Sequence, residues 1–308
     1  MSNPASYSIV IPIFNSEKII SKLYNELIEF FEVSSLQFEI IFVNDGSADK
    51  SSDVLQKIKE SDSKVKVIEF SKNFGQHNAL LCGIRKANNE FIITMDDDLQ
   101  HSPDQLHKLI DKINQGYDVV YGSPKNYSHS FFRNLSSFLT KYALQTTIGL
   151  QNARKFSAFR IFRSYIVKSF YDYKGSFISI DVLLTWGTNN FSYVDVDFKR
   201  RASGKSNYSF KKLLSQAFNM LTGFSIRPLQ LSSLFGFIFA FFGFSILLYI
   251  LLNYFINESS VAGFTFLASL ISIFSGVQLI TIGIIGEYLA RVHFRMMDKP
   301  QYIIKNED

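Results

Sequence analysis

The C-terminal third of the chain is almost free of charge. Between Arg227 and Glu287, Glu258 is the only charged side chain, and it separates two apolar runs, Pro228–Asn257 and Ser259–Gly286. Each run exceeds the roughly 20 residues that a helix needs to cross about 30 Å of hydrocarbon. A buried core helix is the alternative, but a core seldom needs two such runs in succession. We therefore expect a transmembrane hairpin in residues 228–286, with helices at about 229–256 and 262–286.

The flanks of this hairpin predict its orientation. The connecting loop has no Lys or Arg, whereas basic residues precede and follow the two runs: Lys211, Lys212, Arg227, Arg291, Arg295, Lys299 and Lys305. The positive-inside rule then places both termini, including a tail at 287–308, on the cytoplasmic side of the inner membrane. Residues 1–8 are polar, which predicts that there is no signal peptide.

A third segment, 209–227, has apolar residues at helical spacing, from Phe210 to Phe224. This pattern predicts an amphipathic helix, which either lies in the lipid headgroup region or packs on a globular domain. Residues 1–227 carry a net charge of about +6, which suits a domain beside anionic lipid that handles phosphates. The single cysteine, Cys82, excludes a disulfide framework and a Cys-based zinc site.

Residues 1–208 alternate between strand and helix patterns. The expected strands are Tyr7–Phe14, Glu39–Val43, Val65–Phe70 and Phe91–Met95, and the expected helices lie near Glu17–Glu32, Ser51–Glu60, Asn78–Ala87 and after Pro103. This alternation predicts an α/β domain with an open, mostly parallel sheet and helices on both faces.

Polar residues follow three of the expected strands: Asn15, the segment Asn44-Asp-Gly-Ser47, and Asp96-Asp-Asp98. Sites in such sheets gather at the carboxyl ends of the strands. Asn-Asp-Gly-Ser alone is typical of an ordinary turn, but three polar loops at one edge favour a nucleotide pocket.

The three consecutive Asp residues are the most informative of these segments. Alternate residues of an extended segment point the same way, so Asp96 and Asp98 would flank Asp97. Their oxygens, with the Gln100 amide, suit Mg²⁺ or Mn²⁺, which would also bind a diphosphate. A solvated acidic loop that caps the next helix is the alternative.

Four segments occur in order: Ile9-Val-Ile-Pro-Ile-Phe-Asn15, Phe42-Val-Asn-Asp-Gly-Ser47, Asn73-Phe-Gly-Gln-His77 and Met95-Asp-Asp-Asp-Leu-Gln100. Together with the two apolar runs, the set resembles family-2 glycosyltransferases of the polyprenyl-phosphate group. The similarity continues through Arg201-Ala-Ser-Gly-Lys-Ser-Asn-Tyr208, Arg227-Pro228 and Gly286-Glu-Tyr-Leu-Ala-Arg291. It therefore covers nearly the whole chain.

This resemblance implies a GT-A-like, Rossmann-like fold, a nucleotide-diphosphate sugar as donor, a divalent metal, Mg²⁺ or Mn²⁺, and a polyprenyl phosphate as acceptor. By motif position, nucleotide-sugar contacts fall on Pro12, Phe14, Asn15, Glu17, Asp45, Asp96 and Asp97. Metal ligands fall on Asp96, Asp98 and Gln100, acceptor-phosphate contacts on Arg133, Arg201 and Ser206, and catalytic roles on Asp98, Arg160 and Arg201. Simpler interpretations stay open: Phe14 in the core, Arg133 on a solvated helix face, and Lys205 as a membrane-surface charge.

The chain departs from the family pattern at two positions. Many bacterial relatives have Asp-Phe-Arg where this chain has Ala158-Phe-Arg160, so their proposed catalytic carboxylate is missing. Mannosyltransferase-type relatives often have Gly-Ser-Arg where this chain has Gly122-Ser-Pro124. Lys125 or Arg154 are candidates for the missing positive charge. The missing Asp argues against the family's proposed role for that residue in this chain, but the reaction does not require it, because a phosphate monoester, with a second pKa of about 6, can attack without a strong general base.

We therefore expect an inverting transferase that moves a sugar from UDP to undecaprenyl phosphate in cell-envelope glycan synthesis, with GDP and dTDP still open as carriers. A non-catalytic nucleotide-sugar-binding scaffold and a transferase with another membrane-bound acceptor are the alternatives. The Gln-x-x-Arg-Trp motif of processive synthases is absent, since the only tryptophan is Trp186. Asp181 and His77 either touch the sugar or are buried structural residues. We expect no nucleic-acid partner, and a homo-oligomer stays open.

Overall fold

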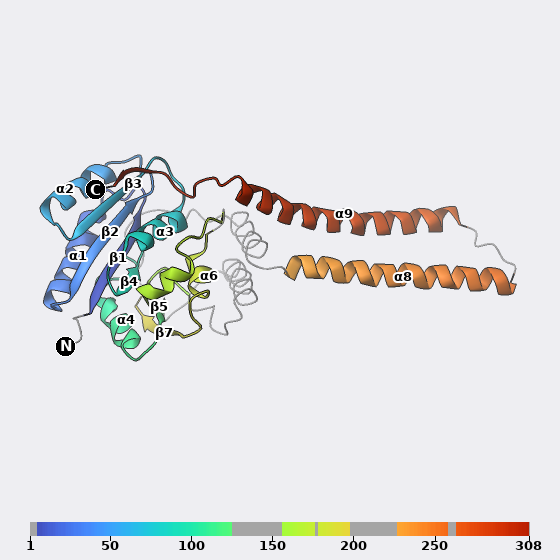
Figure 1. The fold of residues 1–308 in the computed structure, drawn as a ribbon, viewed down its shortest axis with the longest axis horizontal. Helices are drawn as coiled ribbons and strands as arrows, with labels where there is room; N and C mark the ends of the chain where they lie inside the picture. The colour runs from blue at the N-terminus through green and yellow to red at the C-terminus, as the bar shows by residue number, and fades with distance from the viewer. Residues whose placement is uncertain (1–4, 125–155, 176–177, 198–226, 258–262, 308) are drawn as a thin grey trace. The chain divides into compact units, whose positions relative to one another are not determined.

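The computed structural model describes residues 5–124, 156–175, 178–197, 227–257 and 263–307. The chain divides into two compact units, Met1–Leu214 with Lys299–Asp308, and Ser215–Asp298. The first unit contains the sheet and the second contains two long helices (Figure 1).

The described part of the first unit is built on an eight-stranded sheet of order β7-β5-β6-β4-β1-β2-β3-β8. Strands β4, β1, β2 and β3 are parallel neighbours, whereas β6 and β8 run antiparallel to the strands beside them. The bounds are β1 Ser6–Ile13, β2 Gln37–Asn44, β3 Val65–Phe70, β4 Phe91–Thr94, β5 Val119–Pro124, β6 Arg160–Arg163, β7 Phe191–Val196 and β8 Ile304–Glu307. The predicted mostly parallel α/β sheet is confirmed.

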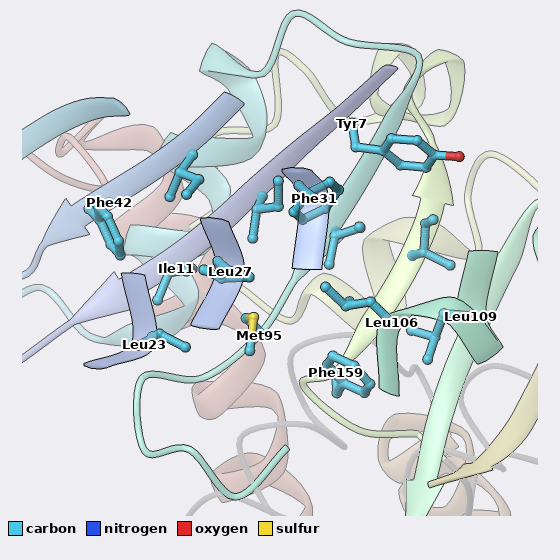
Figure 2. Packing of buried hydrophobic residues seen from close by; sticks show 14 of the residues in the cluster. Tyr7, Ile11, Leu23, Leu27, Phe31, Phe42, Met95, Leu106, Leu109 and Phe159 are labelled. Carbon is cyan, nitrogen blue, oxygen red and sulfur yellow. The ribbon is translucent and has the colours of Figure 1, made fainter. Parts of the chain in front are cut away.

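Side chains of the central strands alternate between two buried cores. Ile9 and Ile11 of β1 face one core, with α1 (Ile20–Val33), α2 (Ser51–Ser61) and α4 (Leu106–Ile113), and the short η1 (Pro103–Gln105) contacts α1 and α4. Val10 faces the other, with α3 (Gln76–Lys86), η3 (Ser164–Ser169) and α6 (Ile180–Leu184). Figure 2 shows part of the first core, in which Leu23, Leu27 and Phe31 of α1 lie beside the strands. Helices therefore cover both faces of the sheet, as predicted.

The end of the chain also belongs to the first unit. Strand β8 pairs with the outer edge of β3, and Tyr302, just before it, stacks on Phe70 with ring centroids 5.1 Å apart. Arg85 of α3 donates hydrogen bonds to Gln301 Oε1 and to the Tyr302 hydroxyl, at 3.1 and 3.2 Å. The tail therefore covers the sheet edge that β3 would otherwise expose.

The second unit contains α8 (Arg227–Asn257) and α9 (Phe264–Met296), which contact each other. Phe239 meets Phe274 edge-on, at 6.0 Å between ring centroids. Within them, Pro228–Ile250 and Ile273–Met296 are long and apolar enough to cross a membrane. Phe237 and Phe241 are 77% and 75% exposed, an apolar surface that suits lipid better than water. The expected amphipathic helix lies outside the described residues, apart from Arg227, which begins α8.

Candidate functional site

The candidate site lies where β1, β2 and β4 end. In the parallel pairing, Ile13 of β1 lies opposite Asn44 of β2, and Val10 lies opposite Thr94 of β4. This register brings the loops 14–17, 45–51 and 95–101 to one edge of the sheet. Pro12 is buried within β1, and Met95, labelled in Figure 2, packs into the core directly before the acidic loop.

The first two loops hold each other through side chains that were predicted to meet the nucleotide. Asn15, in a left-handed conformation with φ of 54°, donates its N–H to Ser47 Oγ at 3.0 Å and accepts the Ala48 N–H at 2.8 Å. Glu17 accepts the Lys50 N–H at 3.0 Å. Phe14 is 48% exposed, so it lies at the surface of this edge and not in the core.

Asp45 is buried and organises a third segment. Its two carboxylate oxygens accept the backbone N–H groups of Phe74 and Gly75, at 2.7 and 2.8 Å. Burial raises the pKa of Asp45, and these two hydrogen bonds oppose that rise. Gly75 has a φ of 98°, and a Cβ on Gly46 would come within 2.4 Å of the Lys72 backbone. Both glycines are therefore required by the way this turn closes.

The three carboxylates of the acidic loop, Asp96 to Asp98, have different hydrogen-bond partners. Asp97 turns back to the first loop, where its Oδ2 accepts hydrogen bonds from the Ser16 hydroxyl at 2.5 Å and from the Phe14 N–H at 3.5 Å. Burial raises the pKa of Asp97, and these hydrogen bonds oppose it. Asp96 accepts from the Gln76 amide at 2.5 Å, and Asp98 accepts the Gln100 N–H at 3.1 Å.

The donor chemistry of this loop fits a hard divalent cation. Among the described residues, no three His, Cys, Asp or Glu side chains are grouped as a metal site. The predicted set contains two carboxylates, Asp96 and Asp98, and the Gln100 amide. Mg²⁺ and Mn²⁺ usually take one or two carboxylates and complete their coordination with substrate phosphates and water. The two half-buried carboxylates are thus sufficient for a cation that a diphosphate shares.

A buried polar cluster lies beneath the acidic loop. Arg160 of β6 is 2% exposed, donates to Thr94 Oγ1 at 3.1 Å, and forms an ion pair with Asp181 of α6. The Tyr121 hydroxyl donates to the same Asp181 oxygen at 3.1 Å, and Thr94 donates to the Ala158 carbonyl at 2.7 Å. The Arg160 guanidinium is therefore fixed inside the domain, with its charge balanced by a carboxylate.

The remaining predicted residues, Arg133, Arg201 and Ser206, lie outside the described residues, as do Lys125, Arg154 and Lys205. Two residues that hold the site together, Ser16 and Gln76, were not predicted. Each adjoins a predicted or motif residue, but neither residue type signals a specific role, because serine and glutamine are common in loops and at helix ends.

Comparison with known proteins agrees with this geometry. The model of the family described as "Glycosyl transferase family 2" matches residues 8–176. The chain belongs to glycosyl transferase family 2. The central strands and the three loops at the sheet edge therefore lie within the part of the chain that matches this family. The predicted resemblance to the polyprenyl-phosphate group is also confirmed, since relatives bearing such a name match over most of the chain.

Two relatives show how far the similarity extends. The Bacillus subtilis (strain 168) protein named "Uncharacterized glycosyltransferase YkcC" is 30% identical, with 99% of this chain and 95% of that protein covered. The undecaprenyl-phosphate 4-deoxy-4-formamido-L-arabinose transferase of Photorhabdus laumondii is 31% identical, with 97% and 93% covered. Both matches therefore include the two long apolar helices as well as the sheet.

Solved structures support the fold. Mannosyl-3-phosphoglycerate synthase from Rubrobacter xylanophilus matches with a TM-score of 0.53 and 14% identity, covering 75% of each chain. Glucosyl-3-phosphoglycerate synthase from Mycobacterium tuberculosis, in complex with Mn²⁺, UDP and phosphoglyceric acid, matches with a TM-score of 0.52 and 14% identity, covering 72% of this chain and 77% of that one. These likenesses confirm the GT-A-like architecture.

Proposed function

We propose that this chain transfers a sugar from a nucleoside-diphosphate sugar to a polyprenyl phosphate, most simply undecaprenyl phosphate. The observation that carries the proposal is the match to undecaprenyl-phosphate sugar transferases over 97% of the chain, apolar helices included. An acceptor with a long hydrocarbon tail requires an enzyme held at a bilayer, and α8 and α9 are long and apolar enough to supply that anchor. Confinement to one plane also raises the effective concentration of the lipid near the site.

The proposal also names the nucleotide carrier and the side of the membrane. UDP is the proposed carrier, because the M. tuberculosis enzyme of similar fold is complexed with UDP. The basic flanks of the helix pair support a site at the cytoplasmic face of the inner membrane, where nucleotide sugars are made. The product then enters cell-envelope glycan synthesis or modification.

In the proposed mechanism, Asp96, Asp98 and Gln100 would hold Mg²⁺ or Mn²⁺, which supplies positive charge beside the departing diphosphate. Asp97 and Ser16 fix the first loop against the acidic loop, so the edge that receives the nucleotide is preformed. Arg133, Arg201 and Ser206 meet the acceptor phosphate, and Arg160, paired with Asp181, holds the buried cluster next to β4 in place. The acceptor oxygen displaces the diphosphate in one step and inverts the anomeric carbon.

The test is sugar transfer by membranes that contain the full chain, given radiolabelled sugar nucleotides, Mg²⁺ or Mn²⁺, and undecaprenyl phosphate. We expect transfer by the wild type and a loss of about 100-fold or more in Asp98→Asn, the scale of removing one electrostatic stabiliser of a transition state. Asp111→Asn is the matched control, because Asp111 is exposed on α4. Wild-type transfer by Asp98→Asn would refute the metal assignment. Thermal stabilisation by nucleotides without transfer to any lipid would favour the scaffold alternative.

A further inference from the structure

In the polar cluster beneath the acidic loop, two atoms have no hydrogen-bond partner among the residues that the structure describes. The Nδ1 atom of His77 is buried and makes no hydrogen bond within the described part of the chain. Asp181 uses one oxygen, Oδ1, for both Arg160 and Tyr121. Its other oxygen has no hydrogen-bond partner among the described residues, and the side chain keeps 16% of its surface exposed. Buried polar groups are nearly always satisfied, so His77 Nδ1 implies a further polar group at this place, and the free oxygen of the partly exposed Asp181 is available to the same group.

The cluster adjoins residues of the candidate site at the sheet edge. His77 follows Gln76, which binds Asp96, and lies two residues after Gly75, which binds Asp45. Helices α3 and α6, which carry His77 and Asp181, contact each other. Arg160 lies opposite Thr94 in the β4–β6 register, two residues before Asp96. The unpartnered atoms therefore belong to elements that border the loops of the candidate site.

The chemistry of the two groups is complementary to a hydroxyl. Burial lowers the pKa of His77, although the nearby charge of Asp181 opposes this, so the imidazole is neutral at neutral pH. A neutral imidazole offers one donor and one acceptor, and an ionised carboxylate offers only acceptors. A hydroxyl group donates one hydrogen bond and accepts others, so it satisfies both side chains at once.

We propose that His77 and Asp181 bind a hydroxyl of the transferred sugar and thereby select which sugar is used. The proposal rests on the proposed transferase function and adds to it the residues that read the sugar. Arg160 and Tyr121 are then positioning residues, because they hold Asp181 in place through its other oxygen. A site that hydrogen-bonds a hydroxyl discriminates strongly against sugars that lack it, since its own polar groups are left unpaired.

The experiment compares the sugar nucleotide with its nucleoside diphosphate, which lacks the sugar. Full-length variants in membranes are assayed with a panel of UDP-, GDP- and dTDP-linked hexoses and pentoses, and the matching nucleoside diphosphate serves as a competitive inhibitor. In His77→Ala and Asp181→Asn we expect kcat/KM for the preferred sugar nucleotide to fall by at least about tenfold, the scale of one hydrogen bond to a charged group. The inhibition constant of the nucleoside diphosphate should change by less than about twofold. The differences in kcat/KM between the sugar nucleotides of the panel should become smaller.

Matched controls and conservative variants separate recognition from folding. His107→Ala and Asp172→Asn remove an exposed residue of the same type, and neither should change either constant. His77→Asn keeps a polar atom near the Nδ1 position and should restore part of the sugar preference. An equal loss for sugar nucleotide and nucleoside diphosphate, or an unchanged preference among sugars, would overturn the proposal and assign the pair a structural role. No transfer by the wild type would instead refute the function on which the proposal depends.

Discussion

Cys82 illustrates how burial alone sets the chemistry of a single residue. It lies in the core between α3 and the sheet, and burial raises the pKa of its thiol to about 12. The thiolate is the reactive form, and an unfolded cysteine has a pKa near 8.5. Folding therefore keeps this thiol protonated throughout the physiological range.

We predict that a thiol reagent labels Cys82 at pH 8 about 2000-fold more slowly in the native protein than after denaturation, which is the ratio of thiolate fractions for pKa values of about 12 and 8.5. Between pH 8 and pH 10 the native rate should still rise, because the pH remains below the native pKa, whereas the denatured rate levels off. Stopped-flow labelling is unambiguous, since the chain has one cysteine. Equal native and denatured rates would show that the site is open.

Local sequence predicts where some site residues lie in the fold, but not which side chains they contact. The sheet-edge position of Asn15, Asp45 and Asp96 could be predicted, because each follows a strand whose apolar pattern is visible. The direction of Asp97 and the pairing of Asp181 with Arg160 could not, because each depends on a partner far away in the chain, such as Ser16. Side-chain partners of this kind are set by tertiary packing, which a pattern in a short window does not contain.

Among the secondary-structure elements, β8 is the one that a local sequence pattern does not predict. The two apolar helices can be predicted from length and composition, because nearly every residue in each run is apolar. Strand β8 is short, and most of it is exposed, so only the free edge of β3 makes it a strand. Sequence analysis therefore expected a tail at 287–308, where the structure has the end of α9 followed by a docked strand.

The contacts that hold this strand predict a measurable contribution to stability. Tyr302 stacks on Phe70 and accepts a hydrogen bond from Arg85. Because Tyr302 is only partly buried, Tyr302→Ala should cost about 2 kcal/mol, less than the 3–5 typical of a fully buried aromatic residue. The Tm of the detergent-solubilised full chain should then fall by about 4–8 °C. Lys305→Ala, which removes an exposed side chain of the same strand, is the control. An unchanged Tm in Tyr302→Ala would show that the docked tail does not stabilise the unit.

At the scale of the whole molecule, the docked tail constrains the topology. The chain leaves the first unit before α8 and returns to it after α9, because Lys299–Asp308 belongs to that unit. The first unit can lie on only one side of a bilayer. If α8 and α9 both span it, the beginning of α8 and the end of α9 must lie on that side, and the connection near Glu258 on the other. The fold thus supports a hairpin independently of the charge pattern.

The charge pattern predicts which side is which, with the connecting loop outside and the tail inside. In a Cys82→Ser background, we predict that a membrane-impermeant maleimide labels Ser259→Cys in intact cells but labels Asn306→Cys only after permeabilisation. Asn306 is exposed on β8, so its cysteine is reachable once the reagent enters. Labelling of both cysteines after permeabilisation is the internal control. The reverse pattern would place the first unit outside, away from the cytoplasmic pool of nucleotide sugars, whereas labelling of both in intact cells would contradict a hairpin that spans the membrane.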